Sequence, residues 1–96
     1  MIYVLIRHRV ANYSAWKRGV MGAASLRKSA GETSFQSYRG SRTPNDITVV
    51  CGWTDMAACK KFVNSAELRV AMKKCGVISK PEVQFFGEMD DLTVKG

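Results

Sequence analysis

Few residues in this chain have side chains that could perform chemistry, and His8 is the foremost of them. It is the only histidine among 96 residues. Because an imidazole has an ordinary pKa of about 6.5, it can accept or donate a proton at neutral pH. We therefore predict that His8 is a catalytic acid or base. The alternative is a histidine at a strand end that only hydrogen-bonds a loop carbonyl.

Large aromatic side chains are the second group of candidates, because they commonly form the walls of pockets for flat ligands. We predict that four of them contact a substrate: Trp16, Trp53, Phe86 and Tyr13. Both tryptophans also fit a second interpretation, as residues of the hydrophobic core. Tyr13 could equally lie at the surface or at a subunit contact.

Motifs for other chemistry are missing from the sequence. It has no GxGxxG, no P-loop, no recognisable Ser/His/Asp or Cys/His arrangement and no dense group of carboxylates. The cysteines Cys51, Cys59 and Cys75 lack the CxxC spacing of a zinc site, and their odd number argues against a disulfide framework. We expect no cofactor, no metal, and reduced, buried thiols.

The charge balance bears on the partners of the chain. A net charge of +7 and a pI of about 9.7 bring nucleic acid into consideration. The basic residues come in scattered pairs instead of long runs, so we expect only nonspecific, salt-sensitive binding to nucleic acid. Acidic residues gather near the end, at Glu88, Asp90 and Asp91.

No segment is typical of export or of membrane insertion. The first apolar run, Ile2 to Ile6, is closed by Arg7 and is too short for a signal peptide or a membrane span. We therefore expect a cytoplasmic protein that does not bind membranes.

These candidates need elements to hold them, and the hydrophobic pattern indicates four strands. Residues 2–8 and 47–53 are apolar on both faces, as central strands are. Residues 33–39 carry more polar side chains, which is typical of an edge strand, and residues 83–88 form the last strand. Gly52 would let a neighbouring group approach the backbone.

Two helical regions alternate with the strands. Asn12 is a suitable N-cap for the first, and Gly31 suits its left-handed end, which predicts one helix of about 27 Å. The second begins after Thr54 or Asp55. Ser65 is a fresh N-cap within it, so we expect this second region to be broken there.

The order strand, helix, strand, strand, helix, strand predicts an α+β, ferredoxin-like βαββαβ fold with a four-stranded antiparallel sheet. The chain is one domain, residues 1–96, with an ordered core over about 1–89 and a tail over 90–96. Both helical regions would cover one face of the sheet. Because the strands also offer apolar residues to the other face, we expect a homodimer through that face.

Three segments are similar to those of one known family: IRHRVANYSAWKR, VVCGWTDMAACKKFVNSAELRVAMKKCGV and PEVQFF. Together they resemble the small dimeric α/β barrel proteins related to the antibiotic biosynthesis monooxygenases, which include short members labelled cyclases. The resemblance covers about residues 1–89. Its specific features are a strand that ends in Arg-His, a helix that starts with Tyr-x-x-Trp, a strand-end Trp followed by Thr-Asp, and the run Ser-x-Glu-Leu-Arg-x-Ala-Met.

The resemblance implies a cofactor-independent monooxygenase or a cyclase-like enzyme that acts on a small aromatic or polyketide-like compound. It places the substrate cleft on the helix side of the sheet, where we expect a cavity of a few hundred Å³. The haem-degrading branch of the same superfamily uses a histidine on a helix. His8 lies on a strand, so haem is not expected.

Two other function classes stay open. One is a non-catalytic ligand-binding or structural homodimer. The other is RNA binding, which the residues favour less, because ITVVCGW lacks the aromatic side chains that stack on bases in the third strand of RNA-recognition domains.

The sequence leaves open which sheet face His8 occupies. His8 shares its face with Ile6, but both faces of this strand are apolar. The same question applies to Trp53 and to the choice between Phe85 and Phe86 as a wall of the cavity.

Overall fold

The computed structural model describes residues 2–93, which form four strands and four helices. In chain order these are β1 (Ile2–Arg9), α1 (Tyr13–Gly22), α2 (Ala24–Ala30), β2 (Glu32–Arg39), β3 (Asp46–Trp53), α3 (Met56–Val63), α4 (Ala66–Lys74) and β4 (Glu82–Phe86). The strands form one antiparallel sheet in the order β2-β3-β1-β4, so the predicted ferredoxin-like fold is confirmed. Residues 94–96 of the expected tail lie outside the described residues.

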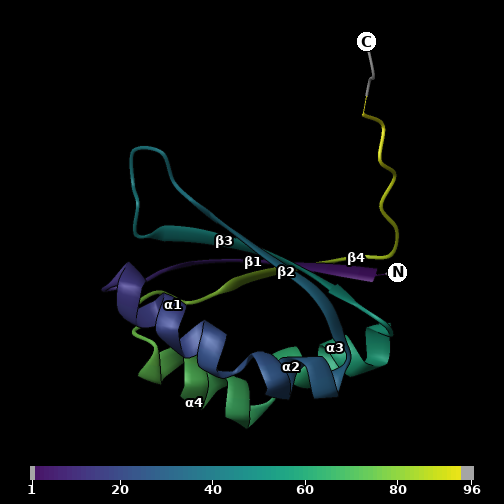
Figure 1. Cartoon of the computed structure of the whole chain (residues 1–96), viewed down its shortest axis with the longest axis horizontal. Coiled ribbons are helices and arrows are strands. Elements are labelled where there is room, and N and C mark those ends of the chain that lie inside the picture. Colours follow the sequence, from purple (N-terminus) through teal and green to yellow (C-terminus); the bar gives the residue numbers. More distant parts are fainter. Residues whose placement is uncertain (1, 94–96) are drawn as a thin grey trace.

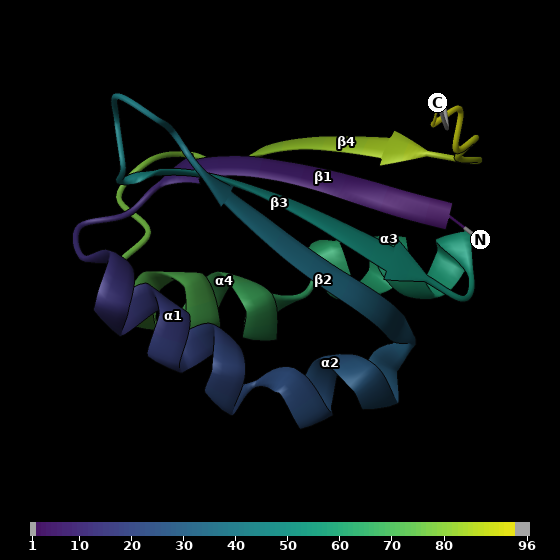
Figure 2. The ribbon, with the colours of Figure 1, turned by 45° about the horizontal axis from the view of Figure 1, so that its top comes forward.

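All four helices lie on one side of the sheet (Figure 1). Figure 2 shows them beneath the strands, and no element of residues 2–93 covers the opposite side. We call this uncovered side the open face. It carries Tyr3, Leu5, Val50 and Phe86, which are partly or largely exposed. None of the helices in the described part of the chain has the length and hydrophobicity that a bilayer span requires.

The strand register decides the face of each candidate residue. Ile6 is paired with Val49 and His8 with Ile47, and all four are buried. Because directly paired residues project from the same face of a sheet, His8 belongs to the helix-covered face. The core between sheet and helices consists of Val4, Ile6, Val10, Trp16, Ile47, Val49, Cys51, Trp53 and Cys59.

Three predicted helix starts are confirmed by their caps. Asn12, Asp55 and Ser65 each accept a hydrogen bond from a backbone N–H in the first turn of the helix that follows, at 3.0–3.1 Å. The predicted break before α4 is therefore real. Gly31 ends α2 with a φ of 123°, a backbone conformation that favours glycine.

The prediction of a single helix over residues 13–30 is wrong. The chain leaves helical geometry at Ala23, whose N–H is shared between the carbonyls of Gly19 and Val20 at 3.1 and 3.2 Å. Such a shared bond tightens the last turn of a helix. Gly22 precedes the break, and glycine is the weakest helix former after proline.

The predicted close approach at Gly52 is present. Its N–H donates a hydrogen bond to the Ser34 hydroxyl at 3.0 Å, across a strand irregularity in β2. A Cβ at this position would lie 3.3 Å from the Tyr3 ring and 2.5 Å from the Ser34 oxygen. Only glycine fits here without a shift of these neighbours.

Candidate functional site

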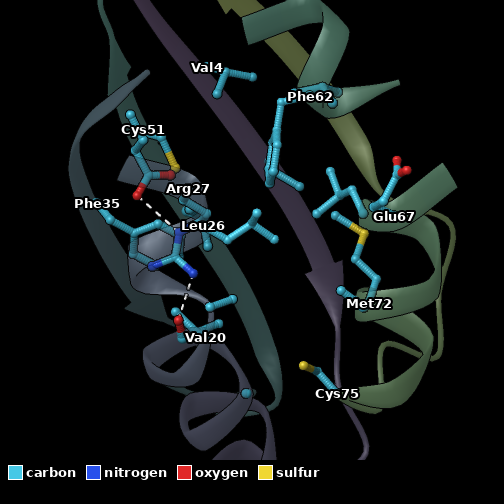
Figure 3. A pocket seen from close by; sticks show the side chains of 18 of the residues that line it. Val4, Val20, Leu26, Arg27, Phe35, Cys51, Phe62, Glu67, Met72 and Cys75 are labelled. Atoms are coloured by element: carbon cyan, nitrogen blue, oxygen red, sulfur yellow. Dashed lines mark hydrogen bonds and ion pairs between the residues drawn. The ribbon is translucent and has the colours of Figure 1, made fainter. Parts of the chain in front are cut away.

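A cavity of about 110 Å³ lies between the helix-covered face of the sheet and the helices (Figure 3). Strands β1 and β3 form its floor, helices α1 to α4 contribute its walls, and most of the lining is apolar. Leu26 of α2 and Glu67 of α4 are exposed residues of this lining, so the cavity opens to solvent between these helices. An apolar cavity of about 150 Å³ holds one benzene molecule. The cavity is therefore smaller than the few hundred Å³ expected, and also smaller than a cavity that holds one benzene ring.

The structure brings three of the five predicted site residues to this cavity. His8, Trp16 and Trp53 all line it. Tyr13 is outside the lining and packs beside Trp16, with the two ring centroids 5.9 Å apart. Its own ring lies 3.8 Å below the Arg39 guanidinium carbon. Tyr13 thus supports a wall of the cavity instead of forming one.

The predicted place of Phe86 in the cavity wall is wrong. The register of β4 pairs Phe86 with Tyr3 on the open face, and Phe86 is 38% exposed. Phe85 is paired with Val4 and packs against the core on the helix side. Because side chains alternate along a strand, one residue of register separates the two faces.

His8 is held tightly on the cavity floor. It is 8% exposed, and its ring lies 5.8 Å from the Trp16 ring at an interplanar angle of 57°. Both ring nitrogens are enclosed by protein and have no hydrogen-bond partner within residues 2–93. Burial lowers the pKa of His8 below its usual value, because the low-dielectric surroundings disfavour the charged form. The imidazole is therefore neutral at pH 7.

Trp53 places a second polar group in the same apolar surroundings. It is 2% exposed and packs on Phe62, with ring centroids 5.3 Å apart. Its indole N–H is buried and has no acceptor among the described residues. A buried donor without an acceptor costs about 1–3 kcal/mol. Trp53 and His8 thus carry polar atoms that no group within residues 2–93 pairs, and they lie at opposite ends of the cavity floor, because His8 is paired with Ile47 and Trp53 with Ile2.

A buried ion pair, which we did not predict, also lines the cavity. Arg27 Nε donates to Glu32 Oε1 at 3.0 Å, and its Nη1 donates to the Val20 carbonyl at 2.6 Å (Figure 3). The guanidinium also lies 4.5 Å from the centre of the Phe35 ring. Desolvation raises the pKa of Glu32, and the Arg27 guanidinium opposes that rise.

The sequence carried one signal for this pair. Arg27 falls on the apolar stripe of the first helical region, together with Trp16 and Val20, where a charged side chain needs a buried partner. Glu32, just after the glycine that ends the helix, is the nearest acidic residue in the sequence.

The cysteines in and near the cavity are free thiols with a packing role. Cys51 and Cys59 are buried and Cys75 is half-buried. Burial raises the pKa of both buried thiols, that of Cys59 to about 11. At neutral pH they are protonated and poor nucleophiles. Within the described residues no three His, Cys, Asp or Glu side chains gather in a way that could hold a metal ion.

Solved structures share this architecture over almost the whole chain, although no protein-family model and no curated protein sequence matches it. A proposed antibiotic biosynthesis monooxygenase from Bordetella bronchiseptica superposes with a TM-score of 0.75 and 20% identity, over 92% of this chain and 96% of that one. SnoaB, a cofactor-independent oxygenase from Streptomyces nogalater, does so with a TM-score of 0.74 and 15% identity, over 95% of each chain. The chain has the antibiotic biosynthesis monooxygenase fold.

The same fold also occurs without a known activity. A protein of unknown function from Nitrosomonas europaea has a TM-score of 0.70 and 16% identity to this chain, over 99% of this chain and 95% of that one. Similarity at these identities establishes the architecture, and a fold hosts many activities. These neighbours therefore do not define the reaction of this protein.

Proposed function

We propose that this protein is a cofactor-independent monooxygenase that oxidises a small hydroxylated aromatic compound in the helix-side cavity. The observation that carries the proposal is His8, a buried imidazole on the floor of an apolar cavity, with no hydrogen-bond partner for either nitrogen among residues 2–93. Such a group is costly for a fold unless it serves a ligand. The shared architecture with SnoaB supports the same reaction class.

The reaction needs only a base, the substrate and dioxygen. Neutral His8 takes the proton of a phenolic hydroxyl, and the resulting phenolate carries high electron density on the ring carbon opposite. That carbon gives one electron to O₂, and the two radicals combine to form a C–O bond and a peroxide anion. The imidazolium returns its proton to the peroxide. Loss of the ring hydrogen as a proton, with cleavage of the O–O bond, then gives a quinone and one water.

Each part of the cavity has a role in these steps. The lowered pKa of His8 keeps it unprotonated and ready to accept a proton at neutral pH. Trp53 does not reach the same substrate oxygen as His8: it is paired with Ile2, six residues along β1 from His8, which is about 20 Å at roughly 3.3 Å per residue, so it closes the other end of the cavity. The apolar walls exclude water, which strengthens the interaction with His8 and protects the reactive intermediates.

The ligand has to widen the cavity to reach these groups. Both nitrogens of His8 are enclosed, and the cavity of about 110 Å³ is smaller than one that holds a benzene ring. The mouth lies between α2 and α4, and α4 has no fully buried residue. In our proposal the substrate enters by moving α4 outward, which uncovers the imidazole.

Oxygen uptake by the purified full chain tests this function. One- and two-ring hydroxylated aromatics are screened for binding by thermal shift, and binders are then assayed with an oxygen electrode, without flavin and with a metal chelator. We expect one O₂ consumed per quinone formed. Removal of a general base typically costs 10²–10⁴-fold, so His8→Gln should lose about that factor in kcat. Lys17→Gln, on the exposed face of α1, is the control.

Two outcomes would contradict the proposal in different ways. Binding without oxygen uptake would favour the passive ligand-binding dimer. Turnover that is unchanged in His8→Gln would remove His8 from the chemistry. Ala71→Phe, which places a ring into the cavity from α4, should abolish binding of any ligand that occupies this site.

The assembled form that we propose is a homodimer through the open face. Leu5 and Val50 are only half-buried there, and Phe86 is 38% exposed, so one chain leaves a patch of large apolar side chains in water. Sedimentation equilibrium at micromolar concentration should give twice the mass of 10.7 kDa. A stable monomer would contradict it.

A further inference from the structure

A second cavity, of about 430 Å³, lies on the open face at the end of β1. Arg7 and Arg9 project into it, on the same face as Leu5, and the loop between β2 and β3 and residues 79–80 form its rim. We call this cavity the basic hollow. Its charged side chains are Arg7, Arg9, Lys80, Asp46 and Glu82, whereas Arg39 borders it but carries its guanidinium over the Tyr13 ring on the helix side.

The basic hollow keeps an excess of positive charge. Arg9 Nε contacts Asp46 Oδ1 at 3.0 Å, and Arg7 reaches Glu82 at only 3.8 Å, with both side chains largely exposed. Lys80 has no ion-pair partner within residues 2–93. Three cations, Arg7, Arg9 and Lys80, thus face two carboxylates among the described residues of this concave site, which suits an anionic partner.

The segment with the opposite character is the one that follows β4. Residues 87–93, which we call the acidic tail, extend away from the sheet and the helices (Figure 1, yellow). The tail holds three acidic residues, Glu88, Asp90 and Asp91, all exposed. Met89 is 58% exposed and Leu92 is 84% exposed. A projecting segment with carboxylates and large apolar side chains is typical of an arm that binds a partner.

We propose that the acidic tail of one chain binds the basic hollow of a second copy, in the homodimer through the open face. The inference rests on that proposed dimer and adds a specific contact to it. Carboxylates of Glu88, Asp90 and Asp91 meet Arg7 and Lys80 of the second copy. Charge complementarity between these two parts of the chain selects a second copy as the partner.

Strand direction supports a contact between chains. Phe86, the last residue of β4, is paired with Tyr3 near the start of β1, whereas Arg7 and Arg9 lie at the other end. In a face-to-face dimer, a twofold axis that crosses the strands reverses their direction. The end of β4 in one chain then lies over the basic hollow of the other. Within its own chain, the tail would have to fold back along the whole strand.

The tail is also long enough. Seven extended residues span about 23 Å at roughly 3.3 Å each, which exceeds the distance of about 13 Å between residues 3 and 7 of one strand. The tail can therefore cross the interface and still place Met89 or Leu92 on the apolar part of the open face.

A charge swap between two variants tests whether the contact joins different chains. Variant one carries Arg7→Glu and Lys80→Glu in the basic hollow, and variant two carries Glu88→Lys, Asp90→Lys and Asp91→Lys in the tail. Arg9 is left unchanged, because it holds Asp46. All five positions are exposed, so the fold should persist, which circular dichroism checks. Both contacts are repulsive in each variant's own dimer and attractive in the mixed dimer.

Native mass spectrometry of the equimolar mixture gives the result. We expect mixed dimers well above the half that random pairing gives, and we expect high salt to reduce this excess. Random pairing would overturn the proposal. A variant that carries all five substitutions in one chain gives a second check: if it regains wild-type stability while it is a monomer, the contact lies within one chain and the proposal is wrong. Saturable binding of inorganic phosphate to the hollow of the wild-type dimer would also overturn it, because the tail would then not occupy the site. None of these readouts depends on oxygen uptake, so the proposed reaction can fail or succeed separately.

Discussion

Replacing His8 by Phe should make the protein less sensitive to acid, and this outcome follows from the burial of the imidazole. In the wild type, protonation of His8 in the folded state is disfavoured by desolvation, so its folded pKa lies below the value of about 6.5 expected in the unfolded chain. Between these two pKa values the unfolded state binds more protons than the folded state. The free energy of unfolding therefore falls as pH falls through this window.

The change of the free energy of unfolding with pH has an upper bound, and the stability at pH 7.5 is the reference for it. A single group changes the free energy of unfolding by at most about 1.4 kcal/mol per pH unit. His8 is the only histidine, so no other side chain of its type contributes. At pH 7.5 the His8→Phe variant should be at least as stable as the wild type. It removes two buried nitrogens without partners, worth about 1–3 kcal/mol, and that gain offsets the strain of a larger ring.

Urea unfolding followed by tryptophan fluorescence at pH 5.0 to 7.5 measures both quantities. Glu32 must be separated from His8, because its raised pKa acts with the opposite sign: the folded state then binds the extra proton, and acid stabilises the protein. The contribution of Glu32 to the pH dependence of stability lies above pH 4.5, the usual pKa of a glutamate, and the substitution Glu32→Gln removes it. Equal slopes for wild type and His8→Phe between pH 5.5 and 6.5 would refute a buried, unpartnered imidazole.

Three further predictions concern the walls of the cavity. Gly19→Ala should lower the free energy of unfolding by about 1–3 kcal/mol, because its Cβ would overlap the Cys75 sulfur. Adding Cys75→Ala to the same chain should restore most of this stability, as measured by urea unfolding. Arg27→Met should lower the free energy of unfolding by about 3–5 kcal/mol, because it leaves the buried Glu32 carboxylate unpaired. Thermal unfolding of the double variant Arg27→Met/Glu32→Gln should show a smaller loss of stability if this is the cause. Alkylation at pH 8 followed by mass spectrometry should label Cys75 before Cys59, whose pKa is raised to about 11; the reverse order would contradict the burial of Cys59.

The sequence predicts the elements well where local chemistry is decisive. Asn12, Asp55 and Ser65 are strong N-caps, and each begins a helix in the structure. The break at Ala23 has only a weak signal in the sequence, the glycines Gly19 and Gly22 before it, because isolated glycines are tolerated inside helices. It depends on a hydrogen bond shared between two carbonyls of α1, which only the folded chain defines.

The face occupied by His8 depends on long-range pairing. Strand β1 is apolar on both sides, so its own residues give no preference. The decision comes from its register with β3, which places Ile47 and Val49 beside His8 and Ile6 under the helices. The same alternation, applied to β4, puts Phe85 inside and Phe86 outside. A strand of five residues at a sheet edge carries too few side chains to fix this choice by pattern alone.

The looseness of α4 has a consequence for which molecules the protein accepts. This helix buries none of its side chains fully, although it walls one side of the cavity and is joined to the rest at Ser65 and at Gly76. Segments with little buried surface open at a fraction of the free energy of global unfolding. Ligand size is then limited by the population of the opened form and not by the resting volume. Substitutions on the surface of α4 that never touch a ligand would change the population of the opened form. They would thereby change the range of ligand sizes that the protein accepts, without any change in the cavity itself.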